Sequence, residues 1–169
     1  MRAIPLITAA FSILAFGAAA SELPKWGDSG DWEIHIDPAA GNGCFMEKLY
    51  DDGTLVRFGA VPLREGGFFS ALNITWTNIK GEGGQKEIKF DFDGVIFSGQ
   101  AVGIAEGLMR GGYVFFDNPK IAMEFSQKNT MTILGTPEGD IAIKLKGTGA
   151  AVKKVRECQL MQPLPPKVE

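Results

Sequence analysis

Apolar and polar residues alternate along much of the chain, which predicts short β-strands because neighbouring side chains on a strand point to opposite faces. In residues 86–93, Ile88, Phe90 and Phe92 alternate with charged neighbours, and residues 31–37 show the same pattern. Further strands are predicted at residues 44–50, 54–60, 68–76, 95–99, 113–116, 130–134 and 140–146. The Asp-Asp-Gly of residues 51–53 is typical of a hairpin turn, because glycine adopts the positive φ that such turns need.

Helical signals occur at two places in the second half of the chain. Asn118 followed by Pro119 is typical of a helix start, and Phe125 lies on the apolar face of that helix. Thr148 is predicted to cap a closing helix that ends near Leu160. Because strands and helices do not alternate repeatedly, we predict a mainly β fold. It would be an antiparallel sandwich or partly open barrel with one short internal helix and a C-terminal helix.

The first 20 residues have the three parts of a secretory signal peptide. Arg2 supplies a positive start, an apolar stretch follows, and small residues precede a predicted cleavage after Ala20. The apolar stretch is shorter than the ~20 residues that span a bilayer. We therefore predict a signal peptide at 1–20, a single β-rich domain at 21–160 and a flexible tail at 161–169, in a protein that is periplasmic or secreted.

Composition and charge argue against several classes of function. The 17 Lys and Arg residues against 20 Asp and Glu give a net charge of −3, with no basic run for binding nucleic acid phosphates. His35 is the only histidine, it lies on the polar side of its predicted strand, and no serine has a nucleophile motif. We therefore expect neither an enzyme nor a cofactor or metal site.

Cys44 and Cys158 are the only cysteines. The predicted export would bring the protein into an oxidising compartment, where disulfides persist. No Cys-x-x-Cys redox motif is present. A structural disulfide between them is predicted, which would tie an early strand to the C-terminal helix. The alternative is a pair of free thiols.

Two pairs of adjacent phenylalanines, Phe68-Phe69 and Phe115-Phe116, lie within predicted strands. Because neighbouring side chains on a strand point to opposite faces, one ring of each pair must leave the main core. That ring is either covered by helices and loops or exposed for a partner. The segment 103–112, rich in glycine, is predicted to be a flexible loop that borders such a patch. The partner-binding residues predicted in this way are Phe68, Phe69, Leu108, Met109, Arg110, Phe115 and Phe116.

Both ends of the predicted mature chain carry motifs of a known group. Residues 30–34 (Gly-Asp-Trp-Glu-Ile), 43–46 (Gly-Cys-Phe-Met) and 143–152, followed by Cys158, resemble small exported alphaproteobacterial proteins related to the invasion-associated locus B family. The cysteine which that family commonly has just after the tryptophan motif is replaced by Ile36 and Asp37, and its inner cysteine pair is missing. The resemblance implies a periplasmic or surface-associated β-rich protein and supplies no catalytic residues.

Three hypotheses for function follow. The first is an exported, non-enzymatic β-domain that binds a protein partner or a cell-envelope component. The alternative is a carrier of a small hydrophobic ligand, with a barrel cavity lined by Phe90, Phe92, Phe97 and their neighbours. The third is a hydrolase whose carboxylates come from distant strands.

Overall fold

A computed structural model describes residues 23–64, 66–81 and 83–163. The predicted signal peptide, and residues 164–169 of the predicted tail, lie outside the described residues. The strands form one antiparallel sheet in the order β1-β2-β3-β4-β5-β8-β7-β6-β9-β10. They are β1 (Lys25–Ser29), β2 (Trp32–Asp37), β3 (Gly43–Leu49), β4 (Leu55–Val61), β5 (Gly66–Asn73), β6 (Gln85–Phe92), β7 (Val95–Glu106), β8 (Met109–Phe116), β9 (Thr130–Thr136) and β10 (Gly139–Lys144).

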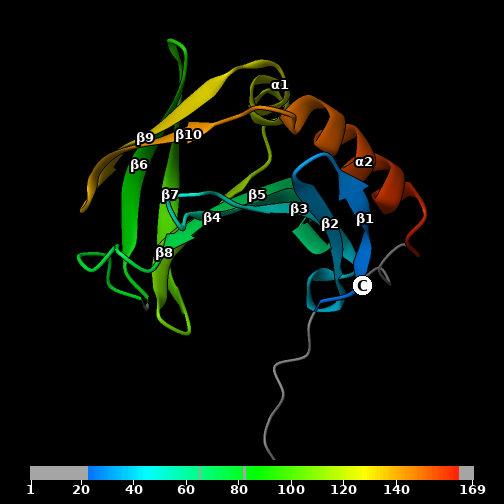
Figure 1. Cartoon of the computed structure of the whole chain (residues 1–169), viewed down its shortest axis with the longest axis horizontal. Coiled ribbons are helices and arrows are strands. Elements are labelled where there is room, and N and C mark those ends of the chain that lie inside the picture. Colours follow the sequence, from blue (N-terminus) through cyan, green and yellow to red (C-terminus); the bar gives the residue numbers. More distant parts are fainter. Residues whose placement is uncertain (1–22, 65, 82, 164–169) are drawn as a thin grey trace, which may run out of the picture.

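The sheet curves strongly but does not close. Figure 1 shows β1 and β2 on one side of the molecule and β6, β9 and β10 on the other, with β4 and β5 between them. The helices are α1 (Pro119–Gln127) and α2 (Thr148–Leu160), with single 3-10 turns η1 (Pro38–Ala40) and η2 (Pro62–Arg64). The prediction of a mainly antiparallel, partly open β fold with a short internal helix and a C-terminal helix is confirmed.

The core lies on the inner face of the curved sheet. Strand alternation brings Trp32, Phe58 and Phe90 to this face, where each is at most 5% exposed. Phe125 of α1 is fully buried among them and stacks on Phe58 with 4.2 Å between ring centroids. Helix α1 therefore contributes Phe125 to the core, and α2 packs beside it on β1 to β4.

A disulfide anchors α2 to the sheet, as the sequence predicts. Cys44 of β3 and Cys158 of α2 are both fully buried and their Cα atoms are 6.0 Å apart. Gln159 adds a second link, because its side-chain oxygen accepts a hydrogen bond of 2.8 Å from the backbone N–H of Cys44. The end of the chain is thus held against an early strand.

The prediction of a flexible loop at residues 103–112 is wrong. These residues form the ends of β7 and β8, joined by a tight turn at Gly107 and Leu108. Their glycines meet a packing requirement: a Cβ on Gly111 would collide with the backbone oxygen of Ala71 on β5. The sequence pattern does not distinguish glycine needed for close approach from glycine in a flexible segment.

Two smaller expectations also differ from the structure. β1 is not among the predicted strands: it is a short edge strand, and its five residues show no alternation of apolar and polar positions. Thr148 was expected to cap α2, but Gly147 is the cap, with φ of 84°, and Thr148 is the first helical residue. The Thr148 hydroxyl instead lies 2.7 Å from the carbonyl oxygen of Phe125, so it links α2 to α1.

Candidate functional site

A mainly apolar hollow lies between the inner face of the sheet and the described residues of the connection from β5 to β6, 74–81 and 83–84. Its volume is about 270 Å³. Figure 1 shows this connection at the end of the sheet where the β9–β10 turn also lies. The larger apolar side chains around the cavity are Phe69, Trp76, Ile79, Ile88, Val114, Ile133, Pro137 and Ile141.

A row of small residues across three strands leaves this space empty. In the sheet register Ala71 of β5 is opposite Gly112 of β8, and Gly112 is opposite Gly103 of β7. Ala101, two residues before Gly103, lies on the same inner face. At the next inward-facing positions along these strands the side chains are larger, Phe69 of β5 among them. The cavity therefore results from the small size of the residues in this one row across the sheet.

The cover of the cavity is fixed to the sheet at two points. The backbone N–H and the side-chain amide of Asn78 donate hydrogen bonds of 2.5 and 3.1 Å to the carboxylate of Glu138 in the β9–β10 turn. The Gly103 N–H donates to the Gly84 carbonyl at 3.3 Å. A Cβ on Gly103 would collide with the backbone oxygen of Lys80, so the absent side chain lets the cover lie directly on β7.

The polar groups around the cavity are few and lie towards its rim. Lys80 of the cover and Lys86 of β6 are the two charged lining residues, with Asn78, Gln85 and Thr136 as neutral polar neighbours. Neither lysine forms an ion pair within 4.0 Å with any residue that the structure describes. The cavity is therefore apolar inside and positively charged at its edge.

The structure separates the two rings of each predicted aromatic pair. Phe69 is 5% exposed in the core, and Phe116 packs on Phe58 of the inner face. Phe68 and Phe115 lie opposite each other on the outer face of β5 and β8. Phe68 contacts Phe45, while Phe115 is 41% exposed and packs edge-on against Tyr113. One ring of each pair does leave the core, as strand geometry requires.

Leu108, Met109 and Arg110 do not join those outer rings. They lie at the β7–β8 turn, where Leu108 is 76% exposed and Arg110 donates to the carbonyl oxygen of Gly107 at 3.2 Å. Phe115 lies six positions after Met109 along β8, which corresponds to roughly 20 Å of strand. The predicted partner-binding residues are therefore distributed over the core, the outer face and a hairpin tip.

The cavity also lies away from the phenylalanines expected to line one. Phe90 and Phe92 surround a void of only about 30 Å³ in the filled core, and Phe92 packs on Phe97. Sequence reasoning missed two sets of lining residues: the small residues of β5, β7 and β8, and, from the cover, Trp76, Asn78, Ile79, Lys80 and Gly84. The inward position of Lys86 in the alternating β6 was a usable signal, since its strand neighbours at the same face are apolar.

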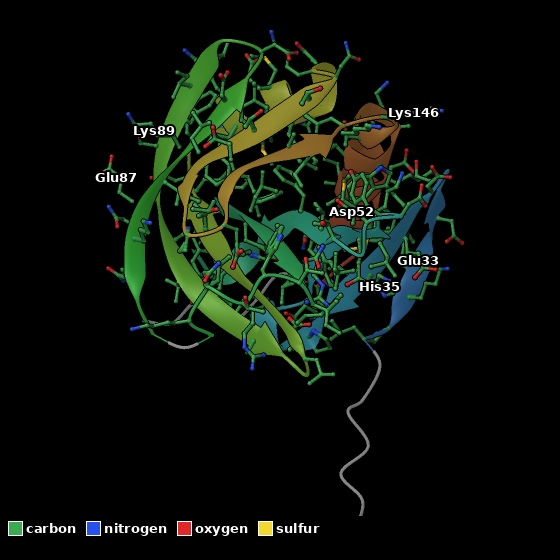
Figure 2. All side chains as sticks on the ribbon, turned by 60° about the vertical axis from the view of Figure 1, so that its left-hand side comes forward. Glu33, His35, Asp52, Glu87, Lys89 and Lys146 are labelled. Atoms are coloured by element: carbon green, nitrogen blue, oxygen red, sulfur yellow. A yellow bond between two sulfur atoms is a disulfide. The ribbon has the colours of Figure 1, made fainter. Side chains whose placement is uncertain are left out.

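A second cluster of chemical interest lies on the outer face of β2 and β3. Potential ligand atoms of Glu33, His35 and Glu47 lie within 4.8 Å of one another. Figure 2 shows Glu33 and His35 next to each other at this side of the sheet. The carboxylates of Glu33 and Glu47 already form ion pairs with side chains. The Lys25 ammonium is 2.8 Å from Glu33, and Arg57 pairs with Glu47.

The charges of this outer cluster stabilise one another. The hydrogen bond from Lys25, followed by that from His35, lowers the pKa of Glu33. Burial of Arg57 lowers its pKa, and hydrogen bonds to Glu106 and Glu47 more than offset this, so the pKa is raised. His35 also stacks on Phe45 with ring centroids 5.5 Å apart. We interpret the cluster as two neighbouring ion-pair groups: Lys25, Glu33 and His35 join β1 to β2, and Arg57 joins β4 to Glu47 of β3 and Glu106 of β7.

No protein-family model, curated protein or solved structure matches this chain. The resemblance to the invasion-associated locus B family stays a prediction. Among the described residues, neither helix has the length and apolar character to cross a membrane.

Proposed function

We propose that this protein binds a small, predominantly apolar molecule in the cavity between the sheet and the cover formed by residues 74–81 and 83–84. The observation that carries the proposal is the cavity itself: about 270 Å³ of space with a mainly apolar lining, beneath a fixed cover. Ligand sites are usually concave and mostly apolar, with a few placed polar groups, and their volumes begin near 300 Å³. The predicted signal peptide and the buried disulfide favour a carrier that acts outside the cytoplasm.

The volume sets the size of the ligand. An apolar protein cavity of about 150 Å³ binds benzene, which has six carbon atoms. In proportion, the cavity here would hold roughly eleven non-hydrogen atoms. A single medium-length alkyl chain or a two-ring compound matches this size, whereas a lipid with two acyl chains does not.

A cavity-filling variant tests the proposal. Ala101→Leu would place three further carbon atoms in the cavity, and at about 0.8 kcal/mol per displaced methylene the affinity for an apolar ligand should fall roughly 50-fold. Decan-1-ol, a neutral compound of the right size, is the probe, and its binding is followed by ligand-observed NMR. Ala142→Leu makes the same change at an exposed position of β10, away from the cavity, and is the matched control.

We expect decan-1-ol to bind the original protein and Ala142→Leu alike and to bind Ala101→Leu far more weakly. Thermal unfolding of each variant shows that the fold is kept. Equal binding by all three proteins, or binding by none, would contradict the proposal.

Partner binding through the aromatic pairs has less support from the geometry. Its seven residues do not form one surface, because Phe69 is in the core and Leu108 lies far along the hairpin from Phe115. It stays a prediction, as does the absence of an enzymatic reaction.

A further inference from the structure

The inner side of β6 ends in a charged residue at the edge of the cavity. Alternation places Lys86 on the same side as Ile88, Phe90 and Phe92, which are all buried. Lys86 pairs with Ala101 of β7 in the sheet register, and both line the cavity. A lysine at an inward-facing position of an otherwise apolar strand face puts an ammonium group at the rim of an apolar space.

The local charge at this rim differs from that of the whole chain. Lys80 of the cover lines the same cavity, so two cations are close to its opening. The carboxylate of Glu138 is near the rim as well, but it accepts two hydrogen bonds from Asn78. The chain as a whole has a net charge of −3, so its long-range field repels anions. A preference for an anion could therefore come only from local groups such as these lysines.

From this arrangement we infer that the ligand is a single-chain anionic amphiphile, a medium-chain carboxylate whose alkyl chain fills the cavity and whose carboxylate contacts Lys86. This inference rests on the proposed function and names its ligand class. The alkyl chain is matched by the apolar lining, and the carboxylate by an ammonium group without an ion-pair partner among the described residues. Lysine suits this role because its long apolar stem can follow the cavity wall while its head remains at the water boundary.

The size of the effect follows from the exposure of the site. Lys86 is exposed, and an ion pair at such a position contributes at most about 1 kcal/mol, which corresponds to a roughly fivefold change in affinity. Decanoate should therefore bind about fivefold more tightly than decan-1-ol, and added salt should reduce this ratio towards one.

Lys86→Met is the decisive variant, and Lys89→Met is its control. Both remove one positive charge from β6, but Lys89 is on the outer face, where Figure 2 shows it pointing away from the interior together with Glu87. We expect Lys86→Met to lose the preference for decanoate while its affinity for decan-1-ol is unchanged. Lys89→Met should retain the fivefold ratio.

The two proposals fail in different ways. If decan-1-ol and decanoate both fail to bind the original protein, the proposed function falls and this inference falls with it. If decan-1-ol binds and Ala101→Leu prevents it, but decanoate binds no more tightly, the proposed function stands and the carboxylate inference is overturned. A fivefold preference that survives in Lys86→Met would also overturn it.

Discussion

Removal of the disulfide should weaken the fold strongly while leaving its architecture in place. In Cys44→Ala/Cys158→Ala the covalent link between β3 and α2 is lost, but the contacts around it are kept. The side chain of Gln159 still links α2 to β3, and Val152 and Val155 remain buried against the sheet. The variant should therefore fold, and its loss of stability should come mainly from a less constrained unfolded chain.

The expected loss follows from the length of the closed loop. The two cysteines are 114 positions apart. In the chain-entropy model a loop of this length stabilises the folded state by about 5 kcal/mol at 25 °C, and loss of a native disulfide typically costs about 2–5 kcal/mol. Stabilities of whole domains are about 5–15 kcal/mol, so the change would be a large part of the total.

Urea unfolding followed by tryptophan fluorescence measures this difference. We expect the free energy of unfolding to fall by about 2–5 kcal/mol, and the urea dependence to become steeper because the unlinked chain exposes more surface. Addition of a reductant to the original protein should reproduce both changes. Gln159→Ala keeps the bridge while removing hydrogen bonds between the same elements, so it should lose only about 1 kcal/mol per bond and leave the slope unchanged. A loss below about 1 kcal/mol without the bridge would refute the reasoning.

Two further predictions concern the close packing at Gly111 and the hydrogen-bonded hydroxyl of Tyr50. Gly111→Ala should destabilise the protein by about 1–3 kcal/mol or more in urea unfolding, because the new Cβ would collide with the backbone of Ala71, whereas Gly107→Asn at the adjacent turn should have a smaller effect; equal, small effects would contradict the packing role. Burial, and then the charge of Asp52, raise the pKa of Tyr50, whose hydroxyl donates a hydrogen bond of 2.5 Å to the Lys144 carbonyl. Because the folded-state pKa lies above the unfolded value of about 10, stability should be fully present below pH 10 and fall as pH rises above it. Tyr50→Phe should lose about 1 kcal/mol at neutral pH and show a shallower alkaline decline in unfolding measurements, and an unchanged decline would argue against the assignment to Tyr50.

Most of the sheet could be predicted because local patterns determine it. Residues 86–93 alternate strictly and form β6, and the glycine at position 53 adopts a φ of 81° in the expected hairpin turn. Asn118 caps α1 as predicted, with its side chain accepting a hydrogen bond of 3.0 Å from the Lys120 N–H. Each of these features depends on residues that are neighbours in the sequence.

The hairpin of β7 and β8 was missed because its pattern depends on distant residues. Gly103 and Gly111 are glycines because the Lys80 and Ala71 carbonyls lie against them, and those contacts join separate parts of the chain. Composition alone assigns such a segment to a loop. β1 was missed for a related reason: it is held by its register with β2 and by α2, while its own five residues show no alternation.

The cavity is the feature furthest from what a sequence pattern can predict, since it requires the small residues of β5, β7 and β8 to lie at one level of the sheet. Their alignment also gives a physical reason to expect a ligand. Larger side chains at Ala71 or Ala101 would fill this space, as Phe69 does at the next inward-facing position of β5. The space kept free beneath a hydrogen-bonded cover, with lysines at its edge, is the geometric basis of the proposal that an apolar molecule binds here.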